Sequence, residues 1–230
     1  MSEFVQSSVI FGVVLSLAAY EAGLFLQKKL KKAYCNPLLI SIILVIVCLL
    51  VLRIDYGSYK SSGQYLSYLL TPATVCLAIP LYRQVELLKG NYKAILGGIL
   101  SGALTSMGLV WLLAVLFQMT HEQYVTLLPK SITTAIAMGV VEELGGYTTI
   151  AVVVIIVTGV VGNIFAEWIC KVFHITNPIA KGVAIGTSSH AIGTTRAMEM
   201  GKIEGAMSSL SIVVCGIITV MLAPVFAMFY

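Results

Sequence analysis

The stretch from Gly186 to Gly205, GTSSHAIGTTRAMEMGKIEG, holds side chains that could do chemistry in a chain otherwise rich in Leu, Ile, Val and Ala. It contains five hydroxyl groups, a histidine, an arginine and several glycines. Free backbone amides at the start of a half-helix, together with hydroxyl groups, can bind an anion such as a carboxylate. A buried imidazole can transfer a proton. The stretch therefore predicts a binding site for a small anion.

Polar groups in two further regions are expected to join this stretch in one cavity. The region 65–82 carries threonines beside its prolines, and the region 127–144 contains the hydroxyl-rich sequence LPKSITT. A short hydroxylated element beside broken helices is typical of a transport site inside a membrane. The predicted substrate-binding residues are Thr71, Thr74, Ser131, Thr133, Thr134, Thr187, Ser188, Ser189, His190, Thr194 and Arg196.

Two of these residues have a second interpretation. His190 either passes a proton or donates to a substrate oxygen, or it is a buried histidine satisfied by a neighbouring Thr or carbonyl. Arg196 either neutralises an anion or forms an ion pair with Glu199 at an exposed helix end, because side chains at i and i+3 are neighbours on a helix. Glu167 lies inside an apolar segment and therefore needs a partner or a water-filled cavity.

Prolines and glycines predict two broken helices. Pro72 and Pro80 each remove a backbone donor and displace a carbonyl, so the helix that contains them is expected to kink or break. Gly186 and Gly193 are expected to give the later polar stretch the same freedom. Unwound backbone is tolerated inside a membrane only where it faces protein or a water-filled cavity. Two such breaks at equivalent places in two halves indicate a transport site.

The composition identifies the surroundings in which these elements fold. Of the 230 residues, 59% are hydrophobic and 10% are charged, with a mean hydropathy of +0.98, whereas soluble domains carry roughly 25% charged residues. We expect an all-α integral membrane protein with seven to eight transmembrane segments, because a chain without alternating strands must cross lipid as helices. The apolar segments lie near 8–27, 36–52, 65–82, 94–118, 127–144, 148–170, 178–198 and 205–229.

Several classes of function find no support in the sequence. It contains no nucleophile elbow, no zincin helix and no phosphate-binding loop, so we expect no enzymatic activity and no cofactor. The five cysteines match neither a metal-ligand spacing nor a disulfide framework, and we expect no metal. The net charge is +4, but the basic residues flank apolar runs, so nucleic acid is not expected as a partner.

The chain resembles itself at a distance of 113 residues. Six identities fall within sixteen positions, and three of them are charged residues in a chain that has few. We therefore expect one membrane domain, 1–230, built from two repeats of about 1–120 and 121–230. The alternative is that two helix ends share an Arg, Glu, Lys pattern by coincidence. The paired residues are Thr74 with Thr187, Ala78 with Ala191, Ile79 with Ile192, Arg83 with Arg196, Glu86 with Glu199 and Lys89 with Lys202.

The fifth apolar segment decides how the repeats are related. Eleven residues separate Lys130 from Glu142, which is about 16 Å of helix against a hydrocarbon core of ~30 Å. We therefore expect 127–144 to enter the membrane and return, which gives inverted repeats; if it crosses, the repeats are parallel. The positive-inside rule does not separate the two topologies, since both place nine basic residues inside and five outside. The orientation in the membrane is left open.

Four motifs together resemble the LrgB/CidB family. They are NPLL at 36–39, AIPLY at 78–82, LPKSITTAIAM at 128–138 and GTSSHAIGTTRAMEMGKIEGAMSSL from Gly186. The similarity covers essentially the whole chain, and the last motif is quite specific. The resemblance implies a multi-pass protein of the bacterial cytoplasmic membrane that works with a smaller LrgA-type membrane protein.

The resemblance implies one of two functions. Members are described as antiholin-like modulators of murein hydrolases and autolysis, or as carriers of small monocarboxylates, as in bacterial pyruvate uptake and the related plant plastidic glycolate/glycerate translocator. We expect a secondary transporter, or transporter subunit, for a small carboxylate substrate such as pyruvate, with His190 as a candidate for proton coupling. A duplicated broken-helix core would be expensive to maintain without a ligand. The alternative is an antiholin-like regulator that acts through membrane partners. A homodimer through apolar spans is compatible with either.

Overall fold

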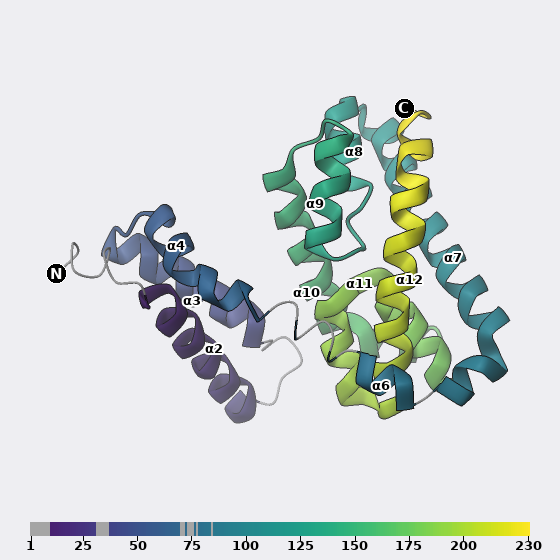
Figure 1. Ribbon diagram of the computed structural model, residues 1–230, viewed down its shortest axis with the longest axis horizontal. Helices are drawn as coiled ribbons and strands as arrows, with labels where there is room; N and C mark the ends of the chain where they lie inside the picture. The colour runs from purple at the N-terminus through teal and green to yellow at the C-terminus, as the bar shows by residue number, and fades with distance from the viewer. Residues whose placement is uncertain (1–9, 31–36, 70–71, 73–75, 77, 84) are drawn as a thin grey trace. The chain divides into compact units, whose positions relative to one another are not determined.

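The computed structural model describes residues 10–30, 37–69, 72, 76, 78–83 and 85–230, and within this part of the chain all regular structure is helical (Figure 1). The all-α prediction is therefore confirmed. The helices are α2 (Phe11–Leu30), α3 (Pro37–Leu52), α4 (Tyr56–Ser67), α6 (Ala78–Arg83), α7 (Val85–Phe117), α8 (His121–Leu127), α9 (Thr134–Glu143), α10 (Thr148–Val172), α11 (Pro178–Met200) and α12 (Lys202–Ala227).

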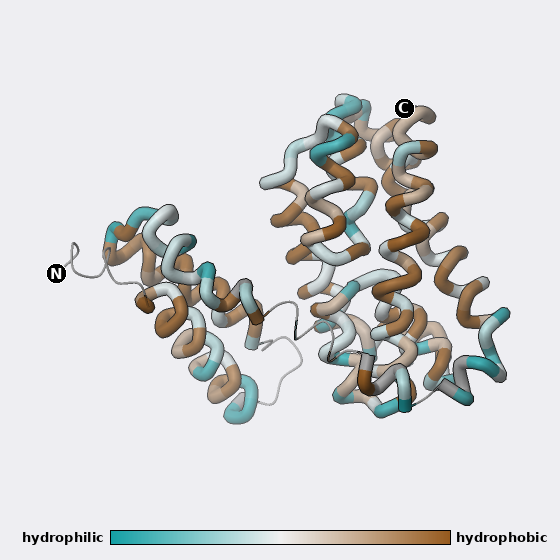
Figure 2. Tube along the Cα trace, viewed as in Figure 1, coloured by the Kyte–Doolittle hydropathy of each residue, from teal (hydrophilic) through white to brown (hydrophobic). Residues whose placement is uncertain are grey.

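Three helices are long and apolar enough to cross a membrane. They are Lys89–Phe117 within α7, Thr148–Val172 (α10) and Lys202–Ala227 (α12), and α3 is a shorter apolar helix. Figure 2 shows hydrophobic residues along most of α3 and α12. These helices confirm a membrane protein. The described residues nevertheless hold fewer long apolar helices than the seven to eight spans predicted from the sequence.

The chain divides into two compact units, Met1–Cys76 and Leu77–Tyr230. In the first unit, α2 packs against α3 and α4. Small residues allow this contact: the backbone N–H of Gly12 donates to Ser62 Oγ at 2.9 Å, and a Cβ on Gly23 would lie 2.6 Å from the carbonyl oxygen of Pro37.

The first predicted break is described only in part. α4 ends at Ser67 and α6 begins at Ala78, and α6 has six residues with Pro80 inside it. Pro72 is exposed. The predicted site residues Thr71 and Thr74 lie outside the described residues.

In the second unit, α7 and α12 run in the same direction. At their carboxyl ends, Trp111 Nε1 donates to the carbonyl of Phe229 at 3.2 Å, and the Tyr230 hydroxyl donates to the carbonyl of Ala114 at 3.1 Å. Near their amino ends both helices lie beside the start of α11, because Ile95 and Ile179 line one cavity and Ile179 lies one turn before Gly182, which approaches Glu204. We call these the carboxyl end and the amino end of the unit.

The segment 127–144 leaves the carboxyl end and returns to it. α9 has ten residues, about 15 Å of helix, which is half of a hydrocarbon core of ~30 Å. After α9 the backbone N–H of Tyr147 donates to Thr126 Oγ1 at 2.8 Å, so the two ends of the segment meet. The geometry agrees with the predicted entering and returning path. We call α8, α9 and their connecting loop 128–133 the first hairpin.

The helix α11 is a second hairpin, because its axis reverses at His190. His190 has φ 41° and ψ −141°, outside the helical region. A Cβ on Gly193 would lie 3.1 Å from Ile185 Cγ2, although eight residues of straight helix would separate these positions by about 12 Å. The sequence predicted that a span over 178–198 breaks at Gly186 and Gly193. The break instead falls at His190, and residues 178–189 and 191–200 are two short half-helices packed side by side.

Contacts with α12 confirm the reversal of α11. Ser208 faces both half-helices: its carbonyl oxygen lies against Gly186, and its hydroxyl forms a 2.7 Å hydrogen bond with Thr194 Oγ1. Further towards the amino end, Gly205 of α12 lies against Met198. The second half-helix therefore runs back along α12 to the amino end.

The two hairpins enter the unit from opposite ends and meet midway along α7. Thr187, near the tip of α11, lies against Gly102, and Ser131, in the loop of the first hairpin, bonds to Ser106. Gly102 and Ser106 are one helical turn apart. In Figure 1, α8 and α9 lie towards the end marked C and α11 lies at the other end of this unit.

This arrangement bears on the predicted repeat symmetry. The 113-residue shift pairs the segments 94–118 and 205–229, which correspond to α7 and α12. Because neither hairpin crosses the unit, α7 and α12 are separated by one crossing helix, α10, and so run the same way. The inverted arrangement predicted from the sequence is therefore not what this pair shows. The prediction treated 178–198 as a segment that crosses the membrane completely. With that additional crossing, α12 would run opposite to α7.

Replacing Gly186 tests the packing of α11 on α12. In Gly186→Ala the new Cβ would collide with the Ser208 carbonyl oxygen and lie 2.7 Å from Ser211 Cβ. We expect the free energy of unfolding to fall by about 1–3 kcal/mol, measured as a lower midpoint of thermal unfolding of the detergent-solubilised protein. The control Gly97→Ala adds a Cβ with nothing within 4 Å and should raise stability by up to about 1 kcal/mol. Equal losses in both variants would contradict the packing.

Candidate functional site

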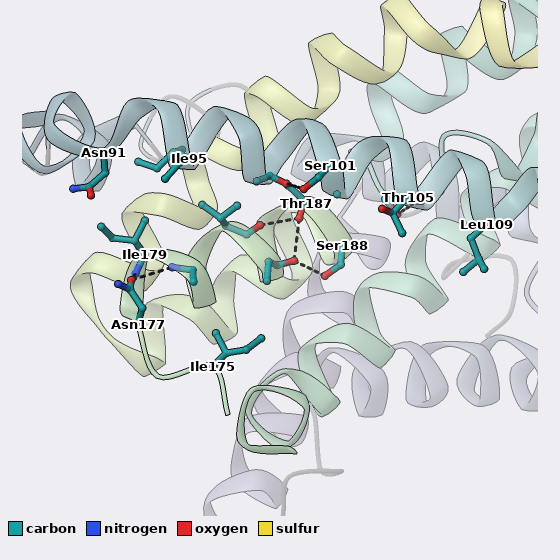
Figure 3. Close-up of a pocket in the computed structure, with 18 of the residues that line it drawn as sticks. Asn91, Ile95, Ser101, Thr105, Leu109, Ile175, Asn177, Ile179, Thr187 and Ser188 are labelled. Atoms are coloured by element: carbon teal, nitrogen blue, oxygen red, sulfur yellow. Dashed lines mark hydrogen bonds between the residues drawn. The ribbon is translucent and has the colours of Figure 1, made fainter. Parts of the chain in front are cut away.

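A cavity of about 740 Å³ extends along α7 from Asn91 near the amino end to Leu109, past the point where the two hairpins meet, and is bounded by α7, the first half of α11 with the residues before it, and the loop of the first hairpin. This volume falls within the range of small-molecule sites. Figure 3 shows side chains of α7 on one side and those near the start of α11 on the other. The described polar lining residues are Asn91, Ser101, Thr105, Ser106, Lys130, Ser131, Asn177, Thr187 and Ser188.

The cavity contains some of the predicted substrate-binding residues. Ser131, Thr187 and Ser188 line it, so the structure brings together the polar loops of 127–144 and 178–198. The remaining described candidates are not among its lining residues, namely Thr133, Thr134, Ser189, His190, Thr194 and Arg196. Thr133 is the N-cap of α9 without a side-chain capping bond, and Thr134 is the first residue of that helix.

Lys130 is a functional candidate that our sequence-derived list omitted. Its ammonium donates to Ser106 Oγ at 3.2 Å and to Ser131 Oγ at 3.1 Å. The two serine hydroxyls are themselves 2.9 Å apart. Lys130 is partly buried, and no ion pair involves it among the described residues. It places an uncompensated positive charge beside a cavity at the middle of an apolar helix, which is unusual and points to function.

The wall contributed by α7 is a second feature that the sequence prediction missed. Small and hydroxyl residues recur at intervals of three and four, which places them on one face of the helix. The signal was present in the sequence but lay inside a strongly apolar span. The residues of this face that line the cavity are Gly98, Ser101, Gly102, Thr105 and Ser106.

The hydroxyl groups of α11 have their protons engaged by the helix itself. Thr187 Oγ1 donates to the carbonyl of Val183 at 2.8 Å, and Ser188 Oγ donates to the carbonyl of Ala184 at 2.8 Å. A hydroxyl has one proton and two lone pairs, so these groups offer acceptors to the cavity. At the start of α11, the Asn177 side chain accepts from the N–H groups of Ile179 and Ala180, which occupies donors that an anion would otherwise use.

His190 lies at the tip of α11 but its ring packs against α10. The residue is 3% exposed, and its Nε2 is 3.0 Å from the carbonyl oxygen of Ile155. Gly159 makes room for the ring, since a Cβ there would lie 2.7 Å from His190 Cε1. This contact corresponds to the second interpretation, a buried histidine satisfied by a neighbouring carbonyl.

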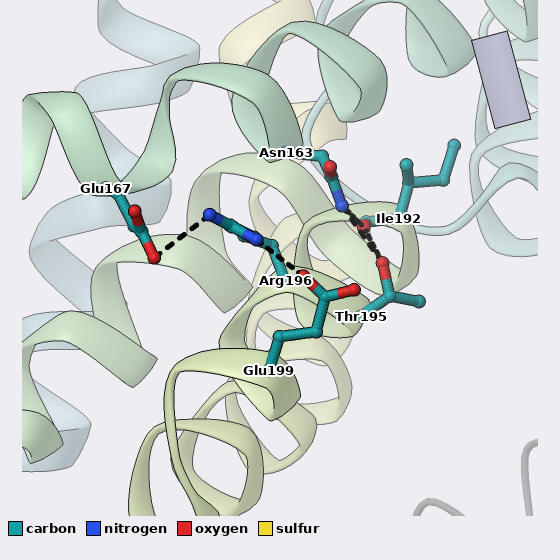
Figure 4. Close-up of polar contacts among 6 residues, drawn as sticks. All are labelled: Asn163, Glu167, Ile192, Thr195, Arg196 and Glu199. Atoms are coloured by element: carbon teal, nitrogen blue, oxygen red, sulfur yellow. Dashed lines mark hydrogen bonds and ion pairs between the residues drawn. The ribbon is translucent and has the colours of Figure 1, made fainter. Parts of the chain in front are cut away.

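Arg196 joins the second half of α11 to α10 through two ion pairs. Its Nη2 lies 3.0 Å from Glu167 Oε1, and its Nη1 lies 2.6 Å from Glu199 Oε2. Figure 4 shows the guanidinium between the two carboxylates, with Asn163 bonded to the carbonyl of Ile192 nearby. Arg196 thus supplies the partner that Glu167 was predicted to need. Because two carboxylates already compensate the charge of Arg196, its interpretation as a helix-end ion pair agrees with the structure better than a role in binding an anion. In the described part of the chain, no group of three His, Cys, Asp or Glu residues could hold a metal.

The chain is similar to known proteins over its full length. Residues 16–229 match the LrgB-like family. An antiholin-like protein LrgB from Bacillus subtilis (strain 168) is 38% identical over 220 residues, covering 95% of each chain. A holin-like protein CidB from Staphylococcus aureus (strain N315) is 35% identical over 230 residues, covering 100% of each chain. No solved structure matches the fold.

Two substitutions at His190 test whether the helix reverses there. A positive φ favours glycine over other residues by about 1–2 kcal/mol, whereas in a helix interior alanine is favoured over glycine by about 1 kcal/mol. Both variants lose the ring and its contact with Ile155. We therefore expect His190→Gly to unfold at a higher temperature than His190→Ala in detergent. A higher unfolding temperature for His190→Ala than for His190→Gly would show that α11 is continuous. Gly97→Ala, in the regular helix α7, serves as the reference in which alanine is expected to be the more stable residue.

Proposed function

Because the chain belongs to the LrgB-like family, we propose that it is an antiholin-like membrane protein that regulates murein hydrolase activity and autolysis. The observation that carries this proposal is the similarity to proteins named antiholin-like LrgB and holin-like CidB over essentially their whole length. The apolar helices α7, α10 and α12 agree with an action in the membrane.

The proposal includes a location and an architecture. The chain is a multi-pass protein of the bacterial cytoplasmic membrane and forms one LrgB-like domain. It reaches seven to eight apolar segments by counting the two hairpins and the helices of the first unit together with α7, α10 and α12. The two halves are repeats, and the common direction of α7 and α12 favours parallel repeats for this pair over the inverted arrangement.

The proposal also includes partners. A small LrgA-type membrane protein is the first, and a second copy of this chain is the other. Both would contact lipid-facing surfaces, where small residues allow helices to approach closely. α12 offers an apolar surface for such contacts, because Val213, Ile217 and Val220 are exposed apolar residues spaced by three and four along it.

A second candidate function is a carrier for small monocarboxylates such as pyruvate. The observation that favours it is the cavity that runs along α7 from the amino end and reaches the tips of the two hairpins. Short helices that end inside the membrane next to a polar cavity are typical of secondary transporters. In this function His190, next to the cavity-lining Thr187 and Ser188 in the chain but outside the lining itself, is the residue assigned to proton coupling, and the protein binds and moves its substrate without reacting with it. We propose no enzymatic activity for either function.

The antiholin-like function is tested by lysis. In a Bacillus subtilis strain that lacks its own LrgB protein, expression of this chain should slow detergent-induced autolysis at least twofold and lower murein hydrolase activity in zymograms, because an antiholin opposes lysis. The control is the empty vector, and Gly97→Ala should act as the unaltered chain does. Normal lysis despite full membrane insertion, with the LrgA-type partner present, would refute this function.

The carrier function is tested by flux. Proteoliposomes that contain the chain, alone or with the LrgA-type partner, should take up radiolabelled pyruvate faster than empty liposomes and faster still under an imposed pH gradient. Because proton coupling is assigned to His190, His190→Ala should reduce the stimulation by the gradient at least tenfold. An absence of uptake of pyruvate, lactate, acetate and glycolate by folded protein would leave the regulatory function alone.

A further inference from the structure

We propose that Lys130, Ser106 and Ser131 form a recognition site for the carboxylate group of a small monocarboxylic acid. The three residues come from two elements that the fold brings together, the loop of the first hairpin and the middle of α7. The inference rests on the cavity that favours the carrier function, but it concerns binding and holds whether or not the ligand is transported.

The charge of the cavity indicates an anion. Lys130 is the single ionisable side chain among the described lining residues. The two ion pairs within the described chain both belong to Arg196, so no described carboxylate compensates Lys130. An ammonium partly removed from water, beside the middle of the apolar helix α7, is costly unless an opposite charge comes close. A bound anion supplies that charge.

The number of free donors fits a carboxylate. An ammonium has three N–H donors, and Lys130 uses two of them on Ser106 and Ser131. The two serines have two hydroxyl protons, and one is used in their mutual hydrogen bond at 2.9 Å. One N–H and one O–H therefore remain, held within about one hydrogen-bond length of each other. Two neighbouring donors match the two oxygens of a carboxylate.

The rest of the cavity limits the ligand to a single charge. The lining beyond Lys130 consists of neutral groups, among them apolar Ile95, Leu109 and Val183. The hydroxyls of Thr187 and Ser188 donate to carbonyls of their own helix, so they present oxygen lone pairs, which repel a second carboxylate. The site thus fits an acid with one carboxylate.

The first experiment needs no variant. The unaltered protein, in nanodiscs of neutral lipid, is titrated with lactate and with lactamide, which has nearly the same shape but no charge. We expect lactate to bind at least tenfold more tightly than lactamide, and chloride at equal concentration not to displace it. Equal affinities for the acid and the amide would overturn the proposal, as would displacement by chloride, because a spherical anion makes no use of two donors.

The second experiment assigns the site to Lys130. Lys130→Gln should weaken lactate binding at least tenfold and leave lactamide binding unchanged, whereas Lys130→Arg should remain within about threefold of the original affinity. The matched control is Lys89→Gln, which removes the same charge from an exposed position of α7 outside the cavity and should have no effect. Unfolding temperatures confirm that each variant is folded. Unchanged lactate affinity in folded Lys130→Gln would refute the assignment.

These outcomes are separate from those of the proposed functions. Binding that depends on Lys130 in a protein that shows no flux supports the site and removes the carrier. Flux that survives Lys130→Gln supports a carrier and overturns the site. Lysis assays in cells report on the regulatory function and require neither result.

Discussion

Inside a membrane, backbone N–H and C=O groups that lose their helical hydrogen bonds must find other partners within the protein. The reversal of α11 at His190 is possible only because this condition is met. The structure provides these partners around the turn. Thr194 Oγ1 donates to the carbonyl of His190 at 2.9 Å, and Asn163 Nδ2 of α10 donates to the carbonyl of Ile192 at 2.8 Å. No buried side-chain nitrogen or oxygen in the described residues lacks a hydrogen-bond partner. The tip of the second hairpin is thus held by α10 as much as by its own sequence.

Close packing by glycine makes this arrangement possible, since a hairpin of two half-helices must fit between three longer helices. Gly162 of α10 lies against Ser189, Gly186 lies against α12, and Gly102 of α7 lies against Thr187. At each contact the glycine has no side chain, so the neighbouring helix can approach its backbone closely, as is usual where helices associate in lipid. Gly186 and Gly193 themselves are helical and the turn falls at His190, so these glycines serve packing: Gly186 admits α12, and Gly193 lets the two half-helices lie against each other.

Much of this could be predicted from the sequence, and the parts that could not have physical reasons. Composition and apolar runs predict α7, α10 and α12 because burial in lipid requires long apolar helices. The hydroxyl groups of Ser131, Thr187 and Ser188 indicate the cavity. The direction of the chain after His190 is not encoded locally, because a straight helix and two antiparallel half-helices share the same 3.6-residue period.

The omitted residues show the same limit. Lys130 gains its meaning from Ser106, twenty-four residues earlier, and no local pattern links the two. His190 and Arg196 have the side chains of a binding site, yet contacts with Ile155 and Glu167 occupy them. Residue type alone does not separate groups that face the cavity from groups that stabilise the fold; the tertiary arrangement does.

The position of Lys130 beside the middle of α7 has an electrical consequence. The two hairpins each reach only to the middle of the unit and meet there. Moving one elementary charge across the whole membrane changes its energy by about 2.3 kcal/mol per 100 mV. A charge held at half depth therefore experiences about half of this amount. An anion bound beside Lys130, as proposed above, would therefore bind with an affinity that depends on the membrane potential.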